Sequence, residues 1–375
     1  MKACLGPAFP RVSDARRILI VLCVAVVLVL TGCGKKKISK TELRAITTEI
    51  VTSTQRISGR KPEVTIRPQL QLSKTGMPAK LAADNVYISL FDASQVGAIA
   101  QGLNEIARRH QLSVSETTSD GVTRFDYAYN DVRTHTIHVV TPLTLHSHPA
   151  VKPGGGNGRL AIIIDDLGYD RAAADSILAL GFPLTVSVLP HLALSMEVAE
   201  EAYLRGDQVM LHLPMQSESD AAKTEEVELR VGMNEQQVDS ALAGMLETVP
   251  HAVGVNNHQG SRATADPALM ATLMPELRRR GLFFVDSRTL ASTVAYDTAK
   301  RLGVRAASRK VFLDDSADRD AILRQLDLAA HDANRDGFAI AIGHPRPDTI
   351  ATLAEALPQL EARGIRLVFV SDVVK

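Results

Sequence analysis

The sequence predicts an α/β protein whose main part is a distorted or incomplete (β/α) barrel. Two observations carry this prediction. Residues 159–375 alternate short apolar runs with amphipathic stretches, which is the pattern of a parallel sheet with helices between its strands. Glycines stand where several of these helices should end, each a few residues before the next apolar run. About seven or eight strands in about 215 residues fit a (β/α) barrel, with a doubly wound sheet as the alternative.

Length and composition limit the classes of protein that the chain can be. A chain of 375 residues corresponds to about two domains. Its 42 basic and 42 acidic residues balance, so a strongly basic nucleic-acid-binding protein is not expected. Aromatic residues are only 4% and Trp is absent, which also argues against stacking platforms for bases. We therefore expect no nucleic-acid partner.

All three cysteines, Cys4, Cys23 and Cys33, lie within the first 33 residues. This distribution excludes a disulfide framework, a cysteine metal site and a thiol nucleophile from the rest of the chain. Any metal site there must use His, Asp and Glu side chains.

The N-terminus has the features of a bacterial export signal. Arg16 and Arg17 precede the apolar run 18–30, whose thirteen residues suit a signal peptide and are short for a membrane-spanning helix. The run ends in LTGC at 30–33, which resembles a lipobox, so we expect residues 1–32 to be a signal peptide and Cys33 to carry the lipid. An uncleaved signal anchor is the alternative. Both predict an exported, membrane-anchored protein on the periplasmic side of the envelope, and Gly34 favours the outer membrane.

The segment between the signal and the barrel is expected to contain three parts. Residues 33–84 are polar and predict a tether with one short helix around 40–52. Residues 85–142 predict a small α+β domain. Its expected elements are strands at 86–90, 123–129 and 134–140 and a helix at 93–110. Residues 143–158 contain prolines and three consecutive glycines and predict a linker.

Polar residues directly follow six of the strands expected in the barrel. The expected strands are 160–164, 184–189, 208–211, 252–255, 282–285, 311–313, 338–342 and 366–370. The polar strand ends carry Asp165 and Asp166; His212; Asn256, Asn257, His258 and Arg262; Asp286 and Arg288; Asp314 and Asp315; His344 and Arg346. Parallel strands bring such ends to one face of the sheet. Single residues of this kind are commonly helix caps, but the whole set predicts a metal or acid–base site.

Five of these strand-end motifs, in this order and spacing, resemble the divergent polysaccharide deacetylase family. They are IIDDLG at 163–168, LHLPM at 211–215, GVNNHQGS at 254–261, FVDSR at 284–288 and IGHPRP at 342–347. The resemblance covers about residues 158–375. It implies a NodB-like distorted barrel of the carbohydrate esterase group.

The resemblance also implies roles for individual residues. In the wider group the first motif supplies a general base and a metal ligand, which we assign to Asp165 and Asp166 in that order, although the reverse order is possible. The usual His-x-x-x-His pair is missing, because His212 stands alone, so the second imidazole is expected from His258. His344 matches the late histidine that acts as general acid. We therefore expect one divalent metal ion, zinc, on Asp166, His212 and His258, with Asp286 as a further catalytic residue.

The expected function is metal-dependent hydrolysis of an N-acetyl amide or ester on cell-envelope polysaccharide or a peptidoglycan-like substrate. Four further residues are candidates for substrate binding: Arg262, Arg288, Arg346 and Asn257. The arginines can equally orient a carboxylate or serve as structural ion-pair partners. A non-catalytic glycan- or partner-binding protein is the alternative, which the missing histidine pair favours. A barrel phosphodiesterase is a third class, but Glu is absent from these strand ends.

Overall fold

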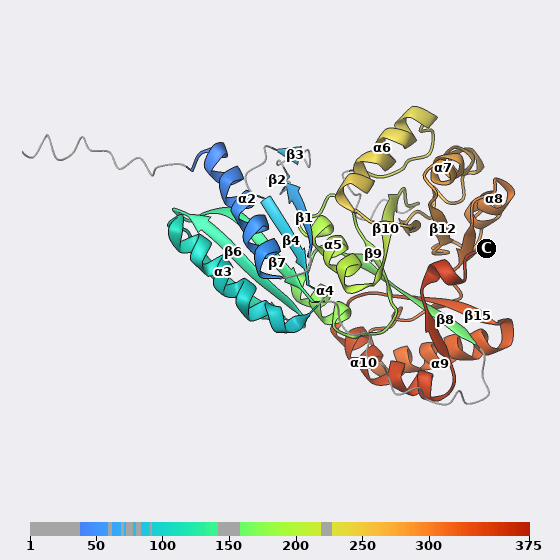
Figure 1. The fold of residues 1–375 in the computed structure, drawn as a ribbon. Coiled ribbons are helices and arrows are strands. Elements are labelled where there is room, and N and C mark those ends of the chain that lie inside the picture. The colour runs from blue at the N-terminus through green and yellow to red at the C-terminus, as the bar shows by residue number, and fades with distance from the viewer. Residues whose placement is uncertain are drawn as a thin grey trace, which may run out of the picture.

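The computed structural model describes residues 38–58, 62–68, 71–72, 78–79, 84–90, 92–119, 121–141, 158–218 and 227–375. They form an N-terminal α/β unit and a C-terminal barrel unit (Figure 1). The predicted signal peptide, Cys33 and nearly all of the predicted linker lie outside the described residues. Within the ranges given above, no helix is both long and apolar enough to cross a membrane.

The N-terminal unit is a five-stranded sheet with two helices packed on one face (Figure 1). The strand order is β1-β4-β7-β6-β5. The elements are α2 (Lys40–Ile57), β1 (Glu63–Pro68), β4 (Asp84–Ser89), α3 (Val96–Arg109), β5 (Ser113–Ser119), β6 (Val122–Tyr129) and β7 (Val132–Val140), with a small pair β2 (Gln71–Leu72) and β3 (Pro78–Ala79) beside them. Three strands and one helix of this unit agree with the sequence-based expectation, and β5 was not expected.

The start of this unit lies earlier than residue 85. Ser39 caps α2 through a capping box with Glu42, which satisfies free backbone amides at the helix start. Ile46 and Ile50, one turn apart, are buried in the same hydrophobic cluster as Ile99 of α3. The helix expected around 40–52 is therefore present as α2, and it belongs to the folded unit, as does β1, which pairs with β4. The sequence signal for α2 was weak because the rest of this helix is largely polar.

The barrel unit is a parallel sheet in the order β13-β12-β11-β10-β9-β8-β15-β14, with β16 also paired to β8. The strands are β8 (Arg159–Leu167), β9 (Thr185–Val188), β10 (Gln208–Met215), β11 (Gly254–Gln259), β12 (Phe283–Asp286), β13 (Ala306–Ser308), β14 (Val311–Phe312), β15 (Phe338–Gly343) and β16 (Arg366–Val368). Seven helices accompany them: α4 (Arg171–Leu178), α5 (Ser195–Arg205), α6 (Glu235–Thr248), α7 (Pro267–Arg279), α8 (Ala295–Arg301), α9 (Arg319–Asp336) and α10 (Pro347–Ala362). The predicted incomplete (β/α) barrel is confirmed, with β13 as an unexpected short strand.

Alternate residues of each strand face the inside of the barrel and the surrounding helices. On β8, Ala161 and Ile163 belong to the inner cluster, whereas Leu160, Ile162 and Ile164 pack toward the helices. Both faces of the strands are therefore apolar, which explains the unbroken apolar runs in the sequence. Because successive side chains on a strand point to opposite faces, this alternation also determines which strand-end side chains point into the barrel mouth.

The two edges of the barrel sheet meet at a seam. β13 and β14 are its edge strands, and only Arg309 and Lys310 connect them along the chain. The backbone amide of Arg309 donates to the carbonyl of Asp286 at 2.9 Å, and that of Lys310 donates to Ile340 at 2.9 Å. No ladder joins β13 to β14 in the described residues, so the barrel is incomplete at this position.

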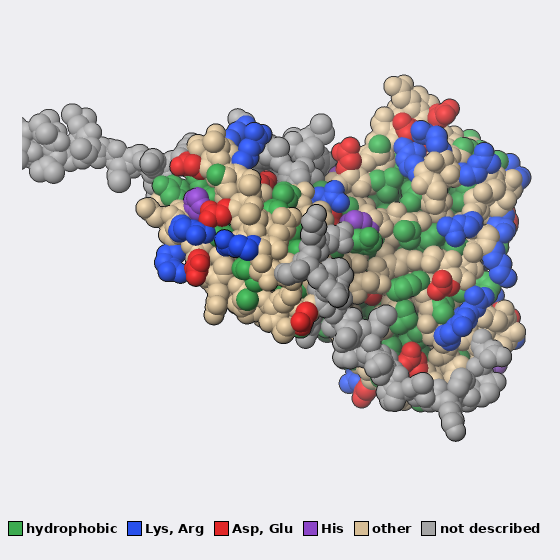
Figure 2. Space-filling view, viewed as in Figure 1, with side chains coloured by type: hydrophobic (Ala, Val, Ile, Leu, Met, Phe, Trp, Pro, Cys, Tyr) green, Lys and Arg blue, Asp and Glu red, His purple; other side chains and the backbone are tan. Residues whose placement is uncertain are grey.

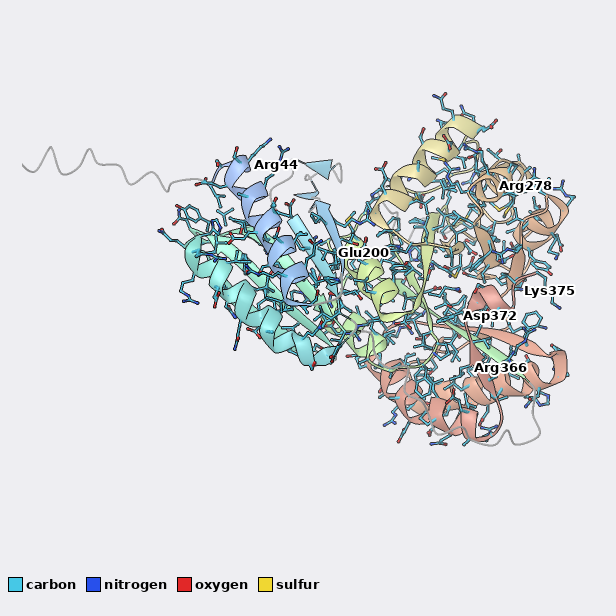
Figure 3. The ribbon with its side chains drawn as sticks, in the orientation of Figure 1. Arg44, Glu200, Arg278, Arg366, Asp372 and Lys375 are labelled. Carbon is cyan, nitrogen blue, oxygen red and sulfur yellow. The ribbon has the colours of Figure 1, made fainter. Side chains whose placement is uncertain are left out.

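Helix α5 connects the barrel to the N-terminal unit through buried ion pairs. Glu200 lies at this junction (Figure 3) and accepts a hydrogen bond from Arg67 of β1. Glu201 is fully buried and lies 2.7 Å from the Nδ1 atom of His138, which is also fully buried. Arg171 of α4 pairs with the other oxygen of Glu201. The two units therefore share a network of charges that neither unit completes alone.

Candidate active site

Asp165 and Asp166 stand at the carboxyl end of β8. Asp165 continues the inward-facing series of Ala161 and Ile163 and is buried. At Asp166 the ladder to β9 shifts register and the backbone enters the left-handed region, with φ of 58°. This local irregularity explains how two neighbouring carboxylates reach the same mouth of the barrel, since regular strand geometry would send them to opposite faces.

Three side chains from three strands converge on one point. Asp166 Oδ1 lies 3.2 Å from His212 Nε2 and 3.1 Å from His258 Nδ1. The two ring nitrogens are themselves 3.1 Å apart. Tetrahedral zinc with bonds of about 2.0–2.2 Å would place its ligand atoms about 3.4 Å apart. Asp166 Oδ1 is buried and accepts no well-aligned hydrogen bond from the described residues, so the set fits a divalent metal ion.

The hydrogen bonds of His212 prepare its Nε2 atom for this role. Its Nδ1 lies 3.2 Å from Oδ1 of Asn256, an acceptor, so Nδ1 carries the proton that is donated there. Burial alone lowers the pKa of His212, but the carboxylates of Asp165 and Asp166 outweigh it and raise the pKa to about 9. The same negative field that favours a proton on this ring favours a metal cation in its place.

Asp165 lies beside the three candidate metal ligands, with one of its oxygens 3.7 Å from His212 Nε2. Asn256 donates its amide to both carboxylate oxygens, at 2.9 and 3.1 Å. Burial raises the pKa of Asp165, against the lowering effect of the charges of His212 and His344. A carboxylate with a raised pKa at the edge of a metal site has the properties of a general base.

His344 follows β15 and forms a pair with Asp314. Its Nδ1 lies 3.0 Å from one oxygen of Asp314, and its backbone amide donates to the other at 2.7 Å. Burial lowers the pKa of His344, but the hydrogen bond to Asp314 outweighs this and the pKa is raised. The free ring edge faces the centre, with Nε2 3.7 Å from Asp166 Oδ2. A protonated imidazole in this position can donate a proton to a leaving group.

Two residues expected in the site point away from the barrel mouth. Asp286 shares the outer face of β12 with Phe284, and its oxygens accept hydrogen bonds from Arg288 N, Thr293 Oγ1 and Tyr296 N. Asn257 is buried on the outer face of β11 and is bonded to the Ser287 amide and the Gln259 carbonyl. Both side chains stabilise loops. They face away from the barrel mouth because each is directly next to an inward-facing residue on its strand.

The three arginines proposed for substrate binding, Arg262, Arg288 and Arg346, are exposed around the strand ends. Arg346 donates to the carbonyl of Asp314, so it also supports the loop of the His344 partner. Sequence reasoning assigned no role to Asn256 or Arg309. Asn256 could have been found from the period of two, since it stands two residues before His258 on the same strand.

The fold and the site define the class of protein, which is an α/β barrel of the polysaccharide deacetylase type. The chain belongs to the divergent polysaccharide deacetylase family, whose model matches residues 162–374. This confirms the resemblance noted in the strand-end motifs.

Two relatives illustrate this membership, and one solved structure shares the fold. An uncharacterized protein of Haemophilus influenzae is 43% identical over 202 residues, which are 54% of this chain and 72% of that protein. The uncharacterized protein YibQ of Escherichia coli is 38% identical over 203 residues, which are 54% of this chain and 63% of YibQ. The crystal structure of an uncharacterized protein from Agrobacterium tumefaciens C58 matches 61% of this chain and 94% of that chain, with 22% identity and a TM-score of 0.55. This last likeness shows the fold.

Proposed function

We propose that the chain is a metal-dependent hydrolase that removes acetyl groups from a cell-envelope polysaccharide. The observation that carries this proposal is the convergence of Asp166 Oδ1, His212 Nε2 and His258 Nδ1, with no pair more than 3.2 Å apart. The carboxylate of Asp165, held by Asn256, and the imidazole of His344, held by Asp314, lie beside them. One carboxylate and two imidazoles match the ligand set of open zinc sites.

The described residues divide the reaction between them. Asp166, His212 and His258 would hold a divalent ion, zinc by its donor set. When bound, such an ion supplies Lewis acidity toward water and the acetyl carbonyl. Asp165 accepts the proton of the attacking water as the carbon–oxygen bond forms. His344 Nε2 donates a proton to the leaving nitrogen or oxygen as its bond to the acetyl carbon breaks, so the products are acetate and the free amine or hydroxyl.

A second candidate function is glycan or partner binding without turnover. His258 Nδ1 and His212 Nε2 are close enough to form a hydrogen bond with each other at 3.1 Å. This hydrogen bond can hold the two imidazoles together without a metal ion. It therefore favours a site that keeps its residues but does not catalyse hydrolysis.

The decisive experiment measures metal content and acetate release on the same protein. The unmodified protein should bind one divalent ion per chain and release acetate from an N-acetylated glycan. His258→Ala should lower metal affinity by orders of magnitude, because two protein ligands rarely hold zinc tightly. His331→Ala changes an exposed histidine of α9 and serves as the matched control. Glycan binding without acetate release, at full metal loading, would support the second function instead.

We also propose that Cys33 carries a lipid that anchors the exported protein in the bacterial envelope. The LTGC sequence at 30–33 after an apolar run supports this proposal. Cys33→Ser should abolish incorporation of labelled fatty acid and signal cleavage. An unchanged mature mass after this substitution would favour an uncleaved signal anchor.

A further inference from the structure

Arg309 is fixed at the seam of the barrel, at the rim of the site. Its Nε donates to the carbonyl of Ser287 at 2.6 Å, and Nη2 donates to the carbonyl of Arg288 at 3.0 Å. Its guanidinium lies over the ring of Phe312, 5.0 Å from the centroid. Two hydrogen bonds and a cation–π contact leave this side chain little rotational freedom.

Arg309 is also close to the residues proposed for catalysis. The Phe312 ring packs edge-to-face against the His344 imidazole, with centroids 5.4 Å apart. Arg309, Phe312 and His344 therefore form a continuous row along the rim. Burial and the positive charge of Arg288 lower the pKa of Arg309, and the negative charge of Asp165 opposes them, so Asp165 and Arg309 lie within electrostatic range of each other.

The charge of Arg309 is not neutralised by a direct carboxylate partner. Burial lowers the pKa of Arg309, and the positive charge of the neighbouring Arg288 lowers it further. Within the described ranges, the side-chain hydrogen bonds of Arg309 go to backbone carbonyls, and Arg288 is exposed. On the face shown in Figure 2, basic side chains outnumber acidic ones over the right-hand side of the barrel unit. Within these ranges Arg309 has no ion-pair partner, although the charges of Asp165, Asp286 and Asp315 act on it from a distance. Two adjacent guanidinium groups in this arrangement favour a bound anion.

We propose that Arg288 and Arg309 form a subsite for an oxyanion on the substrate, a carboxylate or a phosphate carried by the glycan close to the acetyl group. This inference rests on the proposed function, because it names the charge of the molecule that enters the same site. Guanidinium groups bind both oxyanions through paired hydrogen bonds. An acidic glycan would therefore bind with its charged substituent at the seam and its acetyl group over Asp165 and His344.

Binding measurements test the subsite without requiring turnover. The probes are the neutral disaccharide of two N-acetylglucosamines, the N-acetylglucosamine–N-acetylmuramic acid disaccharide, and N-acetylglucosamine 6-phosphate compared with N-acetylglucosamine. Isothermal titration of the full chain at low salt should show at least one acidic probe binding about tenfold or more tighter than its neutral counterpart. The preferred acidic probe identifies the source of the anion. Equal binding of both acidic probes and their neutral counterparts overturns the inference.

Single substitutions separate this role from support of the fold. Arg288→Gln changes an exposed side chain and should remove most of the preference without changing the melting temperature. Arg309→Gln should have the same effect on binding. Arg366→Gln, at the start of β16 (Figure 3), is the matched control and should keep the preference. A preference that survives both Arg288→Gln and Arg309→Gln in folded protein overturns the subsite.

Acetate release and probe binding together show whether the proposed function or the proposed subsite is wrong. Absence of acetate release with an Arg-dependent preference for acidic probes would contradict hydrolysis and retain the subsite. Acetate release with no preference for acidic probes would retain hydrolysis and contradict the subsite.

Discussion

Asn256 donates its side-chain amide to both carboxylate oxygens of Asp165, at 2.9 and 3.1 Å. The oxygen of the same amide lies 3.2 Å from His212 Nδ1 and accepts from the hydroxyl of Ser187. One buried side chain therefore orients both the proposed base and one proposed metal ligand. Such supporting contacts fix the tautomer and direction of a metal-binding imidazole.

Substitutions of Asn256 should separate these two contacts. Asn256→Ala removes both, so metal affinity should fall about 10–100-fold and turnover should fall with it. Asn256→Asp keeps an oxygen toward His212 but places a second carboxylate against Asp165. It should retain metal affinity and lose turnover. Titration calorimetry and acetate release measure the two effects, with Asn334→Asp as a control on the outer helix α9. Wild-type metal affinity and turnover in Asn256→Ala would contradict the assignment.

The pair of His344 and Asp314 should affect turnover without affecting metal content. His344→Ala removes the proposed proton donor and should reduce the turnover number about 10²–10⁴-fold. Asp314→Asn should cause a smaller loss, because it weakens the hydrogen bond that raises the pKa of His344. Elemental analysis of both variants should show unchanged metal. A metal loss in His344→Ala equal to that in His258→Ala would make His344 a ligand.

Glu201 should be essential for the stability of the junction between the two units. Glu201→Ala leaves Arg171 and the fully buried His138 without their shared carboxylate. Removing one partner of a buried ion pair costs about 3–5 kcal/mol of unfolding free energy. Glu355→Ala, which breaks an exposed pair with Arg319, should cost about 0–1 kcal/mol. Urea denaturation of the two variants compares these values, and equal losses would refute the structural role of the network.

Asp207 should make stability depend on pH. Burial raises the pKa of Asp207 to about 7, although the positive charge of Arg205 lowers it. A carboxyl whose pKa is raised by folding stabilises the folded state most below its unfolded pKa of about 4, and this stabilisation is lost as the pH rises to about 7. Asp207→Asn stays neutral at every pH. It should therefore be more stable than the unmodified protein by about 4 kcal/mol at pH 8, since folding raises the pKa from about 4 to about 7, and nearly equal to it at pH 4. Urea denaturation across this range should show the difference growing with pH, and a constant difference would be the contrary result.

The sequence predicted the barrel strands well because each is a buried apolar run. It also predicted which strand ends carry the site, since the carboxyl ends of parallel strands lie on the same face of the sheet. Asp286 and Asn257 were placed in the site because they lie at strand ends within the motifs that carry the resemblance. Counting residues from Val285 or His258 would have excluded both, because neighbouring strand residues face opposite sides.

Other features depend on contacts that a single sequence does not reveal. The sequence predicted a helix around 40–52, but it did not reveal that Ile46 and Ile50 pack against α3 and make α2 part of the folded unit. Alternation along β8 would turn the Asp166 side chain away from the barrel mouth, and its left-handed backbone conformation turns it back. Such a conformation is typical of glycine, so an aspartate at this position gives no sign of it in the sequence. Arg309 contacts Ser287, Arg288 and Phe312 because the two edges of the sheet meet beside it, and these contacts are not visible in the sequence.

The seam between β13 and β14 affects how wide the mouth of the barrel can become. The strands that carry the proposed metal ligands, β8, β10 and β11, lie in the continuous part of the sheet with β9 between β8 and β10. Separation of the two edges would break side-chain contacts and a few backbone hydrogen bonds of the turn between β13 and β14. It would not break the hydrogen bonds between paired strands in the described part of the sheet. Arg309 and Lys310 link the two edges covalently, so such a separation can only be small, and it leaves intact the ladders that hold the three proposed metal ligands.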